Sequence, residues 1–360
     1  MQRTGYGRGW RGVLAAIIWA LVVWGAPAQA QETQPAEIRI GLPDQSAGSK
    51  PFIGGPLGLA YIRHSLEQVF EPQGIKIKWS FFKGAGPAVN EALANRQLDV
   101  VYLGDLAAII GRSGGLPTRL LLGSRGSSSY LAATPESGIQ RLDDLRGKRV
   151  AVYKGTADQL SFERALKSAG LNERDIKVIN LDWSAGRAAL SARKVDAVWG
   201  GVSLLTLRPQ GIRIITSSQT LGWANTTQAA VLASQEFIQR YPQTTQQLVD
   251  VLVREAQWSS DPAHLGEYIA LMTEQSQIPA ALFEEQFTPQ TLSLKTSPRI
   301  DPFLHDSLQD SVQRAKAAGL IRSDFSVDEW LEPRFVDNAL KTLALTAAWP
   351  AYDADGNAKP

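Results

Sequence analysis

The chain has 360 residues, with 37 Lys and Arg against 35 Asp and Glu, 44% hydrophobic residues and no cysteine. This length is enough for two lobes of ordinary domain size. A nearly balanced charge without basic clusters argues against nucleic-acid binding, and without cysteine the fold must be stabilised by its core instead of by disulfides.

The first thirty residues predict a cleavable signal peptide. Arg3, Arg8 and Arg11 precede an apolar run at 13–24, and the small-residue sequence Ala28-Gln29-Ala30 follows it. A membrane anchor is the weaker alternative, because this run of about twelve residues is shorter than the roughly twenty that span a bilayer. Removing the three arginines changes the formal net charge from +2 to −1. We therefore expect a protein secreted to the periplasm.

From residue 37 onward, short β-rich runs alternate with helical stretches, which predicts an α/β fold with parallel strands. The predicted strands lie at 37–42, 75–81, 99–103, 119–123, 130–134, 150–153, 177–181, 197–199 and 212–216. The predicted helices lie at 56–70 and 87–95, from Thr156 onward, and then at 235–258 with a break at Pro242, 264–276, 279–287, 302–318 and 327–343.

A phrase of thirteen residues occurs twice, as ALANRQLDVVYLG from Ala92 and as ALSARKVDAVWGG from Ala189. Each copy predicts a helix end, a turn and a buried strand closed by glycine. Upstream, Arg39 and Arg149 open similar strands in the same order. The echo indicates two lobes that are built alike, and the cleft between such lobes is where small ligands usually bind.

These patterns predict a discontinuous lobe 1 at 37–130 and 226–345, because the late helices are expected to pack back on the first unit. Lobe 2 is expected at 131–225. The segment 346–360 is rich in Pro, Asp, Gly and Asn and is expected to form a flexible tail.

Three stretches are similar to one known family: LDVVYLGDL from Leu98, LDDLRGKRVAVYKGT from Leu142 and VDAVW from Val195. They resemble the type II periplasmic solute-binding proteins of ABC importers, specifically the aliphatic sulfonate-, taurine- and nitrate-binding branch that is related to thiamine-precursor binders. The resemblance implies two lobes, each a mostly parallel sheet flanked by helices, with a ligand cleft between them.

The same resemblance implies a small anionic organic ligand and an ABC permease and ATPase as partners. It implies membrane contact only through the permease, a monomer, and neither cofactor nor metal. The sequence departs from the family pattern after Trp199, where Gly200 and Gly201 replace an acidic residue and proline, and in the long loop at 43–56. Both departures concern the specificity for the solute.

Ligands of such sheets bind beyond the carboxyl ends of strands, at helix N-termini. The candidate ligand-binding residues at these places and at the chain crossings between lobes are Gln45, Ser46, Gly104, Asp105, Ser128, Gly155, Thr156, Trp199, Gly200 and Asn225. Each has a structural alternative. Thr156 with Gln159 is a capping box, Asp105 an N-cap, Trp199 a core residue, and Ser128 part of a solvated loop.

The sequence favours an extracytoplasmic solute-binding subunit that closes its lobes about hinges near 127–133 and 222–228 and captures a small anionic solute, an aliphatic sulfonate first. The alternatives are a secreted hydrolase or lyase that uses Asp105 as base, or a ligand-sensing module for a membrane receptor. The three histidines are scattered and no G-x-S-x-G motif occurs, so we expect no enzyme, no catalytic residue and no metal site.

Overall fold

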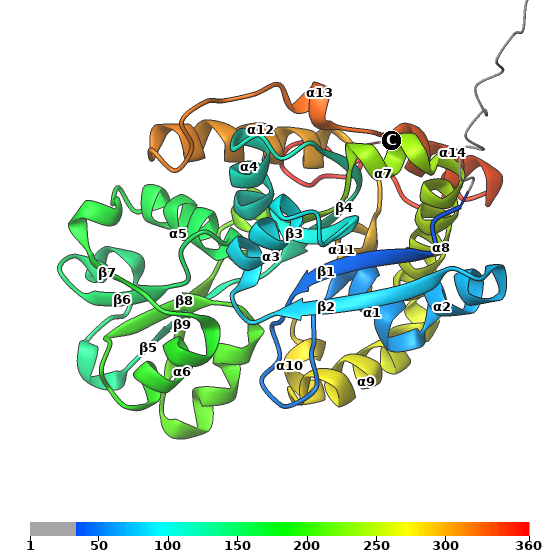
Figure 1. Cartoon of the computed structure of the whole chain (residues 1–360). Coiled ribbons are helices and arrows are strands. Elements are labelled where there is room, and N and C mark those ends of the chain that lie inside the picture. The colour runs from blue at the N-terminus through cyan, green and yellow to red at the C-terminus, as the bar shows by residue number, and fades with distance from the viewer. Residues whose placement is uncertain (1–33, 360) are drawn as a thin grey trace, which may run out of the picture. The chain divides into compact units, whose positions relative to one another are not determined.

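The computed structural model describes residues 34–359, and its core elements are two five-stranded sheets with helices around them (Figure 1). The signal peptide predicted at 1–30 lies outside the described residues. In Figure 1 the strands of the second sheet occupy the green part of the chain, beside the blue and cyan strands of the first.

The first sheet has the strand order β2-β1-β3-β10-β4. Its strands are β1 (Glu37–Pro43), β2 (Lys76–Phe82), β3 (Val100–Gly104), β4 (Thr118–Ser127) and β10 (Thr227–Ser234). β1 pairs in parallel with β2 and β3, whereas β10 runs antiparallel to β3 and β4. A strand from late in the chain therefore completes the sheet that the early strands begin.

The second sheet repeats this arrangement in the order β7-β6-β8-β5-β9. Its strands are β5 (Tyr130–Ala133), β6 (Arg149–Val152), β7 (Lys177–Asn180), β8 (Ala197–Gly200) and β9 (Arg213–Ser217). β6 is parallel to β7 and β8, and β5 is antiparallel to β8 and β9. The predicted two-lobed α/β fold is confirmed, and both sheets are mixed because each contains one reversed strand.

The repeated phrase marks equivalent positions in the two sheets. Asp99 accepts hydrogen bonds from the backbone N (2.9 Å) and Nη2 (2.6 Å) of Arg39, and Asp196 accepts the same pair from Arg149, at 2.7 and 2.8 Å. In each case the carboxylate joins neighbouring parallel strands at the base of the sheet. The preceding turns also match, since Arg96 and Arg193 both adopt a left-handed conformation, with φ of 55° and 57°.

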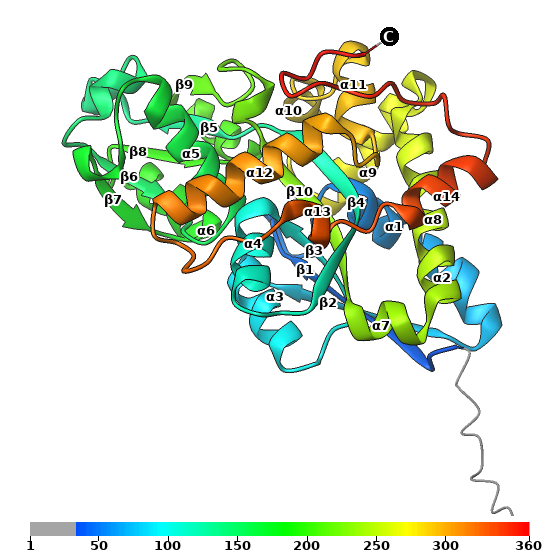
Figure 2. The same cartoon turned by 90° about the horizontal axis from the view of Figure 1, so that it is seen from above.

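Six helices belong to the βα units: α1 (Gly55–Arg63), α2 (Ser65–Phe70), α3 (Ala85–Ala94), α4 (Asp105–Ser113), α5 (Ala157–Ser168) and α6 (Trp183–Ser191). The later helices are α7 (Gln235–Arg240), α8 (Pro242–Ser260), α9 (Leu265–Ser276), α10 (Ala280–Glu284), α11 (Pro289–Thr296), α12 (Pro302–Ala317), α13 (Val327–Trp330) and α14 (Arg334–Thr342). Buried residues of α8 and α14 share one hydrophobic core with β1, and those of α12 share a second core with α4. Figure 2 shows α12 crossing above α4 toward α5.

The structure differs from the sequence prediction at several helical or extended segments. β10 was not predicted, because its sequence TQAAVLAS is poor in strong β-formers and runs directly into a helix. The single helix predicted at 56–70 is two helices, since His64 has a φ of 55°. The helix predicted at 327–343 is likewise interrupted before Pro333, which is consistent with the cost of proline inside a helix.

The C-terminal segment also differs from the expected flexible tail. Trp349 and Tyr352 are buried, at 1% and 6% exposure. The backbone N of Tyr352 donates a hydrogen bond to the carboxylate of Asp301 (3.0 Å), and its hydroxyl donates one to Ser293 (2.9 Å). Polar composition predicted a loose end, but two aromatic residues anchor this segment to the helices of lobe 1.

Candidate functional site

A cavity of about 170 Å³ lies between the two sheets, at the carboxyl ends of their parallel strands. Its walls come from both lobes and from both chain crossings between them. Some residues of each of the segments 43–55, 85–86, 102–107, 127–129, 156–158, 183, 201–203, 227–229 and 272–287 line it, but Ser46, Lys50 and Asp105 do not. The two lobes thus share one cavity, as expected for a ligand held between lobes.

Four of the residues predicted from the sequence lie on this wall: Gln45, Gly104, Ser128 and Thr156. The lobes also approach each other closely at Gly104. A Cβ built on Gly104 would lie 2.8 Å from the Cβ of Ala157, at the start of α5, so glycine is required for this contact. Contact of these four residues with a ligand stays a prediction.

The other predicted residues do not line the cavity. Gly155 donates its backbone N–H to the side-chain oxygen of Gln159 (2.9 Å), and Gly200 lies at a separate small crevice. The hydroxyl of Ser46 accepts from Lys83 (3.0 Å), and the side chain of Asn225 donates to Leu221 O (2.7 Å). Gly155, Ser46 and Asn225 thus have partners within the protein, and ligand contact at these positions stays a prediction.

Trp199 is a core residue, as its alternative interpretation held. Only 1% of Trp199 is exposed, and its ring packs against Phe162 with 5.7 Å between centroids. The capping-box interpretation of Thr156 is wrong in detail. The Thr156 hydroxyl donates to Tyr153 O (2.7 Å) and caps no amide of α5, while Gln159 bonds Gly155 instead.

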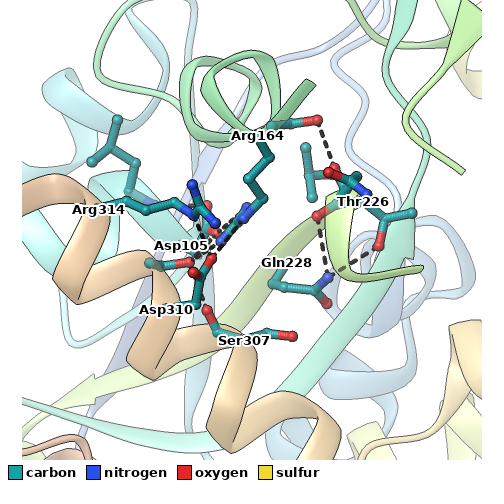
Figure 3. Close-up of polar contacts among 12 residues, drawn as sticks. Asp105, Arg164, Thr226, Gln228, Ser307, Asp310 and Arg314 are labelled. Atoms are coloured by element: carbon teal, nitrogen blue, oxygen red, sulfur yellow. Dashed lines mark hydrogen bonds and ion pairs between the residues drawn. The ribbon is translucent and has the colours of Figure 1, made fainter. Parts of the chain in front are cut away.

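Asp105 is buried in a charged network outside the cavity (Figure 3). Its carboxylate accepts hydrogen bonds from Ser311 Oγ (2.8 Å) and Leu106 N (2.8 Å), and it lies 3.7 Å from Nη1 of Arg164. Burial raises the pKa of Asp105, and the charge of Arg164 opposes that shift. The prediction of a ligand contact at Asp105 does not fit this position, because its partners are supplied by the fold.

Arg164 connects the lobes in this network. It extends from α5 of the second lobe and bonds Asp310 (Nε, 3.0 Å) and Ser311 (Nη2, 2.6 Å), both on α12. One turn nearer the N-terminus of α5, the hydroxyl of Ser161 donates a hydrogen bond to Asn225 O (2.9 Å) at the second crossing. The face of α5 that carries these residues is therefore fixed to lobe 1 by polar contacts.

Glu163, beside Arg164 on α5, is expected to make stability depend on pH. Burial first, and then the charge of Glu173, raise the pKa of Glu163 from 4.5 to about 7. In that interval the folded protein holds a proton that the unfolded chain has released, so stability falls as pH rises from about 4.5 to 7. Glu163→Gln should remove this loss. The difference in melting temperature between the variant and the wild type should rise by about 1–2 °C across that interval. The expected change is small because solvent screens the partly exposed carboxylate.

Thermal unfolding of both proteins at pH 5.0, 6.0, 7.0 and 8.0 measures the difference. Glu91→Gln, on the exposed side of α3, is the matched control and should give a constant difference. A Glu163→Gln difference that is equally constant would contradict the assignment of the raised pKa.

The acid in the cavity that sequence analysis missed is Asp158, in the first turn of α5. Its two carboxylate oxygens accept hydrogen bonds from Ser129 Oγ (2.7 Å) and Trp183 Nε1 (2.8 Å). Burial raises the pKa of Asp158, and these two hydrogen bonds oppose the rise. The positive end of the α5 dipole already faces this carboxylate. The carboxylate therefore offsets the positive potential that the helix N-terminus would offer to an anionic ligand. No sequence signal pointed to the site, because Ser129 and Trp183 come from other elements.

Gln228 supplies a second acceptor at the crossing into β10. Its amide nitrogen donates to Thr226 (3.2 Å to O and 3.1 Å to Oγ1), while its buried Oε1 has no hydrogen-bond partner among the described residues. Among the described residues that line the cavity none is Arg or Lys. The main cavity therefore offers hydroxyls, amides and one carboxylate as its polar groups.

An ion pair between the lobes lies near the cavity. Arg208, in the 3-10 helix Val202–Gln210, donates two hydrogen bonds to Glu285, at the end of α10, over 2.6 and 2.9 Å. Residues on both sides of the pair, among them Ser203 and Gln286, line the cavity. A bidentate geometry of this kind fixes the orientation of two groups as well as their distance.

A family model described as "NMT1/THI5 like" matches residues 70–263, which include most of both sheets. The chain belongs to this family. Its relatives include a candidate aliphatic sulfonates-binding protein of Bacillus subtilis. It is 27% identical over 267 residues, which cover 73% of this chain and 76% of that protein.

Solved structures extend this NMT1/THI5-like relationship. A candidate periplasmic sulfonate-binding protein of a sulfonate ABC transporter from Methylobacillus flagellatus has a TM-score of 0.75 and 27% identity, over 90% of this chain and 98% of that one. The desulfurization enzyme DszB has a TM-score of 0.61 and 17% identity, over 85% and 100%, and shows a similarity of fold alone. The resemblance predicted from the sequence is thus confirmed.

Across residues 34–359 we find no helix with the length and apolarity that a bilayer crossing requires. Within the same part of the chain, no three His, Asp or Glu residues come together in a way that could hold a metal ion.

Proposed function

We propose that this protein is the extracytoplasmic solute-binding subunit of an ABC importer and captures a small anionic organic solute, an aliphatic sulfonate in the first place. The observation that carries the proposal is the cavity shared by two equivalent lobes and lined by both crossings between them. A ligand in that position contacts both lobes, so its binding energy favours the closed arrangement. The names of the sulfonate-binding relatives support the choice of solute.

The proposal places the protein in the periplasm as a monomer that docks on a permease and its ATPase. It needs no cofactor. The signal sequence at the N-terminus supports export, and the relatives include a periplasmic binding protein for taurine from Escherichia coli, 20% identical over 274 residues. The alternative of a receptor-coupled sensor differs only in the docking partner, and the presence or absence of permease and ATPase genes beside its gene separates the two.

A binding role fits the cavity better than an enzymatic one. The candidate base Asp105 is buried, is held by Arg164 and Ser311, and lies outside the cavity. A general base must reach the proton that it removes, directly or through one water. We therefore propose that the protein is not an enzyme. Asp105→Asn should lower the free energy of unfolding, and any turnover that the wild type shows should persist in this variant.

Isothermal titration calorimetry tests the proposal. Ethanesulfonate, taurine, nitrate and benzenesulfonate are titrated into the mature protein, and at least one sulfonate should bind with a dissociation constant of about 1 µM or lower, equivalent to about 8 kcal/mol. Loss of the heat signal with all four solutes would require another ligand class. Release of product from any of them would favour the enzyme instead.

A further inference from the structure

A small polar recess opens beside the main cavity, within lobe 1. Its volume is about 40 Å³, a few times the 10–15 Å³ that one water occupies by the same kind of measure. Four residues line both spaces, so the recess adjoins the cavity: Gly55, Ser127, Gln286 and Phe287. The recess is therefore large enough for a compact acidic group whose remaining atoms extend into the cavity.

Lys295, in the last turn of α11, lines this recess and is only 7% exposed. Its Nζ donates one hydrogen bond, to Gln286 O (2.6 Å), and lies 5.2 Å from the ring centroid of Phe287 and 5.9 Å from that of Trp223. Among the described residues no carboxylate lies within 4.0 Å of it. An ammonium group has three donors, so two N–H groups of this buried cation have no acceptor among the described residues.

The energetic position of Lys295 is unusual. Burial lowers its pKa to about 8. A buried charge costs several kcal/mol unless it is paired, and the other buried cation of the recess, Arg125, has Asp301 at 2.6 Å for that purpose. Lys295 has no such partner in the described chain, although the C-terminal end of α11 and two aromatic faces favour its charge.

A second group lining the recess also lacks an acceptor. The side-chain nitrogen of Gln286 is buried and without a hydrogen-bond partner, and Gln286 is 8% exposed. The Nε of Arg125 is likewise buried and unpartnered. Several donors without acceptors around one small space favour the binding of an oxyanion. Each donor has lost its hydrogen bonds to water on burial, and the oxyanion would replace them.

We propose that this recess binds the acidic head group of the solute, with Lys295 as its counter-ion and Gln286 as a second donor. The inference rests on the proposed function and adds the orientation of the ligand in the site. The acidic end lies at Lys295, and the opposite part meets the acceptors Asp158 and Gln228 Oε1 in the main cavity. Sulfonates with an amino or hydroxyl substituent at the far end fit this arrangement.

Calorimetry on three variants tests the proposal, with taurine and ethanesulfonate as probes. Lys295→Met should weaken sulfonate binding by about 10- to 100-fold, the worth of hydrogen bonds to a charged group of about 1.5–3 kcal/mol. Lys295→Arg keeps the charge and should retain more affinity than Lys295→Met. Lys167→Met, an exposed lysine on α5, is the control and should leave affinity unchanged.

Two readouts separate this role from a structural one. Lys295→Met should melt no lower than the wild type, because it removes an unpaired buried charge, while its affinity falls. At pH 8.5 the wild type should take up a proton when a sulfonate binds, since the anion raises the lysine pKa. Titrations in buffers of different ionisation enthalpy measure that uptake, and Lys295→Met should show none.

The outcomes distinguish the two proposals. The wild type could bind propionate or ethylphosphonate in a way that depends on Lys295 and bind no sulfonate. That result would support the acid-binding recess and reject a sulfonate as the solute. Sulfonate binding that Lys295→Met changes by less than threefold, without proton uptake, would reject the recess and keep the function. Binding of none of these acids would overturn both.

Discussion

Replacement of Arg164 by methionine is expected to lower the free energy of unfolding by about 3–5 kcal/mol. The guanidinium is the only charged partner within 4.0 Å that the described residues give to Asp105, which is 1% exposed. Without it, the carboxylate stays buried with the hydrogen bonds of Ser311 and Leu106 and without an opposite charge. Denaturation by urea, followed by circular dichroism, measures the loss.

Arg146→Met is the matched control for this variant. Arg146 pairs with Asp175 on the surface of the second lobe, with 62% of its side chain exposed. Exposed pairs are worth about 0–1 kcal/mol, so this variant should unfold nearly as the wild type does. A loss below about 1 kcal/mol for Arg164→Met would show that Asp105 needs no countercharge. Such a result would also weaken the view that α5 is held to lobe 1 by this network.

Arg125→Met, within lobe 1, is expected to have an effect of similar size, again about 3–5 kcal/mol. The side chains of Arg125 and Asp301 are 0% and 3% exposed and lie 2.6 Å apart. Asp301 also accepts hydrogen bonds from Leu304 N (3.2 Å), where it caps α12, and from Tyr352 N (3.0 Å). The pair thus joins β4, the start of α12 and the C-terminal segment.

The double variant Arg125→Met/Asp301→Asn tests this explanation. It removes both charges and should be more stable than the sum of the two single losses predicts, since the first substitution has already lost the interaction. Limited proteolysis is a second measurement, and cleavage near Tyr352 should be faster in Arg125→Met. Additive losses and an unchanged C-terminal cleavage rate would contradict the role assigned to the pair.

The fold could be predicted from the sequence because its signals are local. The buried strands are short apolar runs, and Asp99 and Asp196 stand at the same place in a repeated phrase. β10 was missed because it is a strand through its pairing with β3 and β4, while its own residues have weak preferences.

The candidate site was only partly predictable, since it is assembled from distant parts of the chain. Positions at strand ends, such as Gly104 and Thr156, follow from the general geometry of α/β sheets. Asp158 looked like an ordinary acid in a first helical turn until Ser129 and Trp183 were placed beside it. Lys295 carried no signal at all, because α11 itself was not predicted and burial of a single lysine depends on what packs around it.

The order of the strands in the two sheets has a further consequence. β1 to β5 form one half of the strand-bearing part of the chain and β6 to β10 the other, and each half contributes its fifth strand to the sheet of the other. This is the connectivity of two half-length subunits that have exchanged a terminal strand and been fused, a common route from monomer to dimer. Neither sheet is complete without its neighbour's strand, so we expect the lobes to unfold together in a single cooperative transition.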